Sequence, residues 1–170
     1  INNTSTTTYT FTPTAGQCAT TATMTVTVNQ PTTPTFTQVA AICNGGTFTL
    51  PTTSNNSITG TWSPAVNNTA TTTYTFTPTA GQCATTATMT VTVNSLPVID
   101  MSTVAVSNEN CNQSDGSIGG IQVNGGTPNY QYGWNTTPPS TTLSISGLSD
   151  GMYQLVVTDA NGCLSTTSVQ

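Results

Sequence analysis

The feature that most constrains the fold is a regular alternation of threonine with apolar residues. Tyr74 and Phe76 alternate with threonines, and so do Met89, Val91 and Val93 further along the chain. Successive side chains of a β-strand point to opposite faces, so a period of two places the apolar side chains on one face. Threonine is β-branched and suits the other, solvent-facing side. The pattern predicts half-buried antiparallel strands, and no stretch shows a convincing helical period.

Further strands are expected between residues rich in turn formers. Phe48 and Leu50 alternate with Thr47 and Thr49, and the predicted turns are Asn44-Gly45-Gly46, Ser54-Asn55-Asn56 and Ala80-Gly81. Several short strands within about 65 residues are typical of a small β-sandwich.

The chain repeats itself at an offset of 65 residues. Residues 1–29 and 66–94 differ only at the pairs Ile1/Val66 and Ser5/Ala70. We therefore expect one complete repeat over residues 30–94 and, in residues 1–29, the C-terminal part of a preceding, truncated copy. Near-identity between copies favours a spacer, because a spacer needs uniform length and no site in each copy.

After Asn94 the composition changes and a different domain is expected over residues 95–170. Its predicted strands contain Ile121 and Val123, then Tyr130, Tyr132 and Trp134, then Leu143 and Ile145, and finally Tyr153, Leu155 and Val157. Asn161-Gly162 predicts a hairpin with a type I′ turn, whose two central residues need positive φ. The overall expectation is an all-β chain of tandem Ig-like antiparallel β-sandwich domains, arranged as beads on a string.

The lack of cationic side chains makes several functions unlikely to be found in this chain. The 170 residues contain no Lys, Arg or His and only five Asp and Glu, which gives a formal charge of −5. Without cations, binding to nucleic acid or to an anionic membrane surface is not expected. The lack of His and Lys removes the usual general base, the commonest metal ligand and Schiff-base chemistry, so we expect neither an enzyme nor a cofactor. No apolar stretch reaches the roughly 20 residues needed to insert into a bilayer.

Five cysteines leave one without a partner within the chain. Cys18 and Cys83 are equivalent in the two copies, so the repeat arithmetic predicts the pairs Cys43–Cys83 and Cys111–Cys163, with Cys18 joined to a cysteine upstream of residue 1. Trp62 lies between the first pair and Trp134 between the second, as in immunoglobulin domains. Disulfides indicate an oxidising compartment outside the cytoplasm.

Two motifs in the last domain carry a resemblance to a known family. GGTPNYQYGW at residues 125–134 and LSDGMYQLVVTDANGC at residues 148–163 closely resemble the SprB repeat of the giant gliding-motility adhesins of Bacteroidota. The segment GTWSPAVNNTATTTYTFTPTAGQCA is similar to the Thr-rich Ig-like repeats of the same large surface proteins. The resemblance implies export by the type IX secretion system, display on the outer membrane surface and, for the motility adhesin, movement along the cell.

Candidate binding residues are few. Asp115 and Asp159 are weak candidates for calcium, since Asp and Asn next to Gly, as in NQSDGS and TDANG, more often cap turns and a calcium site needs six to eight oxygens. Tyr130, Tyr132 and Trp134 share a strand face and are candidates for stacking on a glycan, against the alternative that they belong to the core.

Two functions follow as expectations. The first is a structural stalk segment of a long surface adhesin that mediates attachment to a substratum and gliding. Its partners are the other domains of the same chain, surface polysaccharide or substratum through distal regions, and the gliding or secretion machinery through regions outside this chain. The second is a glycan- or protein-binding module that the Ig-like repeats merely present.

Overall fold

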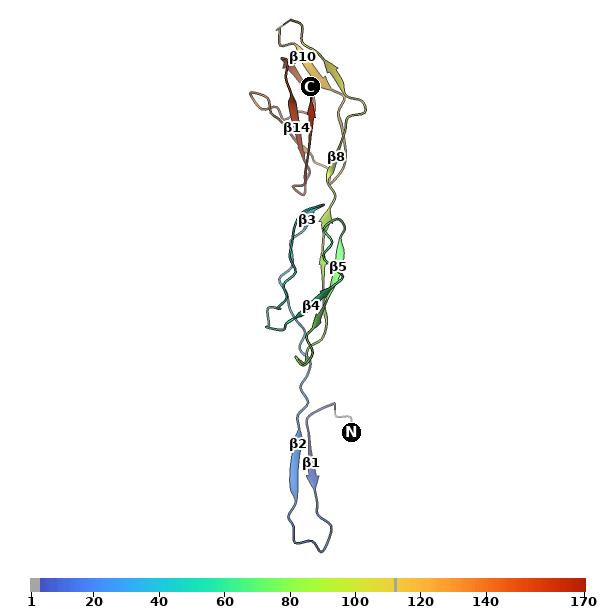
Figure 1. Cartoon of the computed structure of the whole chain (residues 1–170), viewed down its shortest axis with the longest axis vertical. Coiled ribbons are helices and arrows are strands. Elements are labelled where there is room, and N and C mark those ends of the chain that lie inside the picture. Colours follow the sequence, from blue (N-terminus) through green and yellow to red (C-terminus); the bar gives the residue numbers. More distant parts are fainter. Residues whose placement is uncertain (1–3, 112) are drawn as a thin grey trace. The chain divides into compact units, whose positions relative to one another are not determined.

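A computed structural model describes residues 4–111 and 113–170 (Figure 1). Its described residues form strands, turns and loops, so the all-β prediction is confirmed. Among the residues described there is no helix, and therefore none that could cross a membrane. The chain divides into two compact units. The first comprises Ile1–Thr37, Leu50–Ala65 and Tyr74–Met89, and the second comprises Gln38–Thr49, Val66–Thr73 and Thr90–Gln170.

The first unit begins with a β-hairpin. Strands β1 (Thr7–Phe11) and β2 (Ala22–Val26) pair antiparallel, with Tyr9 opposite Met24. On the threonine face, the hydroxyls of Thr8 and Thr25 lie 2.9 Å apart in a cross-strand hydrogen bond. Alternation thus gives this hairpin one threonine face and one apolar face.

A three-stranded sheet is formed by β4 (Gly60–Ser63), β5 (Thr72–Pro78) and β6 (Ala87–Val91), with β5 in the centre. Tyr74 and Phe76 are fully buried, and Met89 is 5% exposed. The Phe76 ring lies 4.8 Å from the ring of Phe36 and 5.2 Å from that of Trp62, centroid to centroid. The apolar face predicted from the alternation is therefore the core of this unit.

The predicted turn at Ser54-Asn55-Asn56 is confirmed. Hydrogen bonds join it to the segment around Thr33 and Thr35. Ser54 is buried, and its hydroxyl accepts the backbone N–H of Ile58 at 2.9 Å. The Asn56 amide donates to the Thr33 carbonyl and accepts from the Thr35 N–H. These bonds hold the chain near Phe36 in place.

The predicted strand over residues 47–50 is wrong. Phe48 and Leu50 are half-buried and their threonine neighbours exposed, as the alternation requires, but no strand is formed there. The period of two describes side-chain orientation in any extended segment, whereas a strand also needs a neighbouring backbone to pair with.

The second unit contains four small sheets. Strands β3 (Ile42–Cys43) and β7 (Val93–Asn94) pair in parallel, and β8 (Pro97–Asp100) pairs antiparallel with β11 (Gln122–Gly125). Two three-stranded sheets complete the unit. One has the order β13-β10-β9 and the other the order β12-β14-β15. Their bounds are β9 Ala105–Ser107, β10 Gly116–Gly119, β12 Gln131–Trp134, β13 Ile145–Leu148, β14 Tyr153–Thr158 and β15 Leu164–Val169.

The core of this unit lies between residues of the two three-stranded sheets. Ile118, Ile145 and Leu148 come from the β13-β10-β9 sheet. They form one buried cluster with Trp134, Leu155, Val157 and Val169 from the β12-β14-β15 sheet, together with Ile121. Two layers with their apolar faces turned together are consistent with a β-sandwich.

The predicted hairpin at Asn161-Gly162 is confirmed, because β14 and β15 pair along their whole length. The predicted type I′ turn is wrong: Gly162 has φ +80° but Asn161 is not among the residues with positive φ. The Gly162 N–H donates to the Asp159 carbonyl at 3.0 Å, and the Asp159 N–H donates to the Cys163 carbonyl at 2.8 Å. The Asp159 carboxylate also accepts the Asn161 N–H, and this extra bond favours the turn observed.

Substitution of Gly120 by alanine is expected to destabilise the second unit. Gly120 has φ +75°, and a Cβ there would lie 2.1 Å from the Thr103 carbonyl oxygen. We expect a loss of about 2 kcal/mol or more in the free energy of unfolding, from backbone strain and overpacking. Gly133→Ala is the control, since nothing lies within 4 Å of a Cβ at that position. Thermal unfolding of both variants measures the difference, and equal melting temperatures would contradict the prediction.

Candidate functional site

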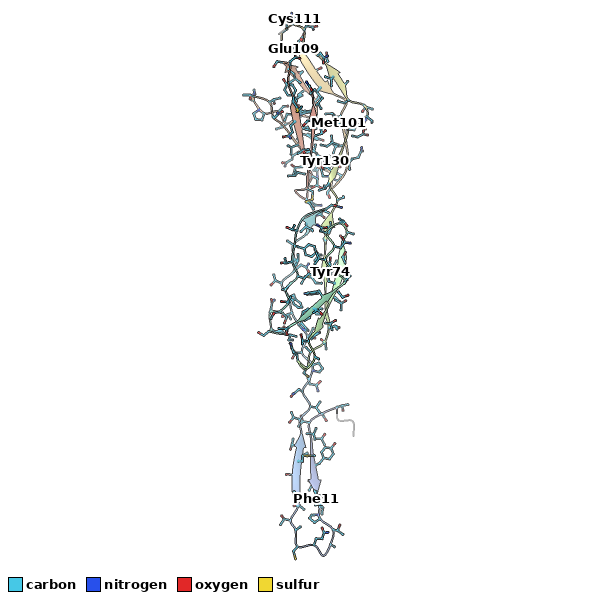
Figure 2. The ribbon with its side chains drawn as sticks, viewed as in Figure 1. Phe11, Tyr74, Met101, Glu109, Cys111 and Tyr130 are labelled. Carbon is cyan, nitrogen blue, oxygen red and sulfur yellow. A yellow bond between two sulfur atoms is a disulfide. The ribbon has the colours of Figure 1, made fainter. Side chains whose placement is uncertain are left out.

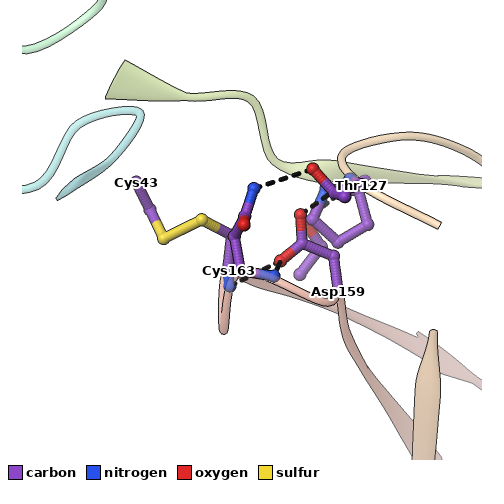
Figure 3. Close-up of a disulfide and its surroundings, with 7 residues drawn as sticks. Cys43, Thr127, Asp159 and Cys163 are labelled. Atoms are coloured by element: carbon purple, nitrogen blue, oxygen red, sulfur yellow. Dashed lines mark hydrogen bonds between the residues drawn. A yellow bond between two sulfur atoms is a disulfide. The ribbon is translucent and has the colours of Figure 1, made fainter. Parts of the chain in front are cut away.

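A single disulfide joins Cys43 to Cys163 among the described residues, with Cα atoms 5.5 Å apart (Figure 3). The predicted pairs Cys43–Cys83 and Cys111–Cys163 are both wrong, and Cys83 and Cys111 are exposed free thiols. Cys18 is also an exposed free thiol in this chain. The bond closes a loop with a sequence separation of 120 residues. In the chain-entropy treatment, a loop of that length stabilises the fold by about 5 kcal/mol.

The strand order explains why Cys83 is not the partner of Cys43. Cys83 precedes β6, and its carbonyl accepts the N–H of Thr32. Cys43 pairs with Asn94, which the chain reaches only after β6 has ended. A disulfide requires Cα atoms within about 7 Å, and an extended strand separates its ends by much more than that.

Cys111 and Cys163 are likewise separated by the length of a strand. Cys163 follows the end of β14, in the turn that leads into β15. Cys111 lies in the loop between β9 and β10, and the Glu109 carboxylate of that loop accepts the N–H of Asp150, which precedes β14. Cys163 is completely buried, so its sulfur is shielded from reductants in solution.

A network of hydrogen bonds fixes the turn that carries Cys163. We call Thr127, Asp159, Asn161 and Cys163 the Asp159 clamp. The Asp159 carboxylate accepts the backbone N–H of Thr127 at 2.9 Å on one oxygen, and those of Asn161 and Cys163 at 2.9 and 2.8 Å on the other (Figure 3). The Asn161 amide donates to the Thr127 hydroxyl at 2.7 Å. The clamp therefore ties the turn before β15 to the loop between β11 and β12.

The pKa of Asp159 reflects this environment. Asp159 is only 4% exposed, and burial on its own raises the pKa of its carboxyl. The backbone hydrogen bonds from Thr127, Cys163 and Asn161 outweigh burial, so the pKa lies below its ordinary value of 3.8. The charged form is the one that the clamp stabilises.

Asp115 and Glu109 also accept backbone N–H groups. The Asp115 pKa is lowered by hydrogen bonds from the side chain and backbone of Asn110, each 2.7 Å long. Glu109 accepts the N–H groups of Ser114 and Asp150, so the loop before β10 meets the turn before β14. The sequence contained no signal for the Glu109 contacts, because the partners are backbone groups brought near by the fold.

The two calcium candidates are not brought together. Asp115 lies beside β10 and Asp159 follows β14, and each carboxylate is occupied by the N–H donors named above. Within residues 4–111 and 113–170, no group of three acidic, cysteine or histidine side chains could hold a metal ion. The arrangement is that of two turn caps.

The aromatic candidates are part of the core or packed against it. Trp134 is 3% exposed, and its indole N–H donates to the Thr142 carbonyl at 2.9 Å. Tyr130, which is labelled in Figure 2, and Tyr132 are half-buried against the same cluster. The Tyr130 hydroxyl donates to the Gly125 carbonyl. Trp134 therefore offers no ring face for a sugar to stack on, in contrast to the glycan-contact hypothesis.

Comparisons with known proteins identify no family for this chain. No protein-family model matches the sequence, and no curated protein is similar enough to it to count as a relative. Residues of the GGTP and TDANGC motifs form the Asp159 clamp, so a structural role in this fold accounts for their presence.

Acidification is expected to destabilise the second unit through Asp159. Because the pKa of Asp159 is lower in the folded chain, the unfolded chain takes up a proton first as the pH falls, and stability is lost below about pH 4. Above that value, with no His, Lys or Arg in the chain, the melting temperature should stay level between about pH 5 and 8.

Asp159→Asn is expected to lower the melting temperature at pH 7 and to weaken the fall in acid. Asp150→Asn is the matched control, since Asp150 contributes its backbone N–H to the Glu109 bond. Circular dichroism melts from pH 2.5 to 8 would measure both variants. The same acid profile in Asp159→Asn and the parent chain would contradict the assignment.

Proposed function

We propose that this chain is a structural stalk segment of a long, exported surface adhesin, built from Ig-like β-sandwich domains in series. The observation that carries the proposal is the Cys43–Cys163 disulfide, because it changes how tension passes along the chain. A pulling force enters a stalk through its backbone. With the bridge intact, the force crosses from Cys43 to Cys163 through covalent bonds, and the residues between them cannot be extended.

The bridge therefore protects most of the second unit from mechanical unfolding. Its core cluster runs from Ile118 to Val169, and all but Val169 lie inside the covalent loop. The Asp159 clamp fixes the turn at which the bridge enters β15. Both features suit a domain that carries load, and neither requires a ligand.

The chemistry of the chain also favours an exposed, extracellular position. A disulfide is typical of oxidising compartments. With no Lys or Arg, the chain has no trypsin cleavage site, and with no His its charge does not change near neutral pH. The resemblance of residues 125–134 and 148–163 to SprB repeats supports a type IX-secreted adhesin of the outer membrane surface, with the substratum and the gliding machinery contacted by other regions.

A glycan-binding module is the weaker alternative. Its proposed contact residues include Trp134, which is buried in the core. No observation in the described part of the chain favours it over the stalk.

Single-molecule pulling tests the load path. When the chain is held at its two ends, reduction of the bridge should release an additional length of about 40 nm, from the separation of 120 residues at roughly 3.6 Å each. Cys43→Ser should show the longer extension without a reductant. Cys83→Ser is the control and should behave like the parent chain, because Cys83 is a free, exposed thiol. An extension of Cys43→Ser equal to that of the parent chain without reductant would refute the load path.

Antibody labelling of intact cells of the source organism tests the location. An antibody against the repeat should label living cells without permeabilisation. Label that travels along the cell would favour a motility adhesin, and label that stays in place a static stalk. Labelling only after permeabilisation would contradict the surface location.

A further inference from the structure

The Cys43–Cys163 disulfide joins the repeat of residues 30–94 to the different sequence that follows it (Figure 3). Cys43 lies in β3, and Cys163 lies in the turn after β14. Because β3 pairs with β7, Cys43 lies opposite Asn94, the last residue of the repeat. The bond therefore spans the place in the sequence where the repeat ends, instead of closing a loop within the repeat.

The turn that carries Cys83 is built like the turn that carries Cys163. Each cysteine lies between the central strand and the last strand of a three-stranded sheet, which is β4-β5-β6 for Cys83 and β12-β14-β15 for Cys163. A glycine with positive φ comes shortly before each cysteine, with φ +91° at Gly81 and +80° at Gly162. Cys83 thus has the same place in its sheet as the bonded Cys163.

Both turns are hydrogen-bonded to equivalent positions of the chain. Thr32 and Pro97 each lie three residues after the asparagine that ends a copy of the repeat. The Thr32 carbonyl accepts the N–H of Thr85 at 3.0 Å, and Thr85 is two residues after Cys83. The Pro97 carbonyl accepts the hydroxyl of Ser165 at 2.6 Å, two residues after the other turn cysteine. The two turns therefore contact the chain at corresponding points.

The sulfur of Cys83 lies beside a residue whose equivalent pairs with Cys43. The Cys83 thiol donates to the Asn29 carbonyl, with 3.5 Å between sulfur and oxygen. Asn29 is 65 residues before Asn94, so it is the same position in the other copy. Asn94 is the residue opposite Cys43 in the β3–β7 pair. A strand like β3 that pairs with residues 28–29 would bring its cysteine next to Cys83.

We propose that Cys83 is a disulfide site for the cysteine that holds the position of Cys43 in the preceding copy of the repeat. Each such bond joins a cysteine of the β3 type to the turn cysteine of the next part of the sequence, and not to the turn cysteine of its own copy. Each thiol loses its proton and one electron as the bond forms, and a small disulfide such as oxidised glutathione takes them up and becomes two thiols. The inference does not rest on the stalk function, because it concerns pairing in the purified chain.

The test is an extended chain in which a second copy of residues 30–65 is joined ahead of Ile1, so that the order of the repeat is continued. The addition brings one further cysteine, the added copy of Cys43. This cysteine can join either Cys18, the turn cysteine of its own copy, or Cys83, the turn cysteine of the next. The purified chain is refolded with reduced and oxidised glutathione, and its disulfides are mapped by mass spectrometry after peptic digestion without reduction.

We expect the added cysteine to be joined to Cys83 and Cys43 to remain joined to Cys163, with Cys18 and Cys111 as free thiols. Cys83→Ser in the extended chain should leave the added cysteine reduced. Cys18→Ser is the matched control, because Cys18 has the same neighbouring sequence as Cys83 and is also an exposed thiol. This control should leave the disulfide map of the extended chain unchanged.

The Cys43–Cys163 bond serves as the check on folding, since it forms only when its strand and turn have come together. The proposal is overturned if the added cysteine is joined to Cys18, because pairing would then occur within one copy. It is also overturned if the added cysteine stays reduced, or joins Cys111, in molecules that carry the Cys43–Cys163 bond.

Discussion

The structure depends on one constraint, which is that the chain contains no cationic side chain. Its carboxylates have no cationic side chain to pair with, and Asp100, Glu109, Asp115 and Asp159 accept N–H donors instead. Asp100 accepts the N–H of Ser102, Asp115 that of Asn110, and Asp159 those of three residues. Each bond keeps the pKa of the carboxyl below its ordinary value. Apolar burial, backbone pairing and a disulfide supply the stability that other domains share with ion pairs.

The disulfide and the Asp159 clamp act at the same point. Cys163 is both the partner of Cys43 and a donor to the Asp159 carboxylate. The clamp holds this turn against Thr127, so the covalent bond enters a part of the fold that is already rigid. The proposed stalk function depends on a bridge attached at such a point, because it would protect the residues inside the covalent loop from extension.

The two copies of the repeat show which structural features the local sequence determines. Residues 7–11 and 22–26 pair antiparallel, and the strands equivalent to them in the second copy, β5 and β6, are likewise neighbours in one sheet. The burial of Phe76 and the exposure of Phe11 differ because only one of them has residues 30–65 packed on it. In this protein the nearby sequence is enough to form these strands, whereas burial of their apolar side chains requires residues from another segment of the chain.

By itself, the sequence determined the β class, the facing of its strands and the hairpin at residues 161–162, because alternation and turn chemistry act over a few residues. It predicted burial at Tyr74 and Phe76 correctly, and a strand at residues 47–50 wrongly, since pairing requires a partner that alternation does not reveal. The cysteine partners, the role of Asp159 and the burial of Trp134 were decided only by the tertiary structure. A disulfide or a clamp requires groups within a few ångströms, and strand order sets those distances between residues far apart in the chain.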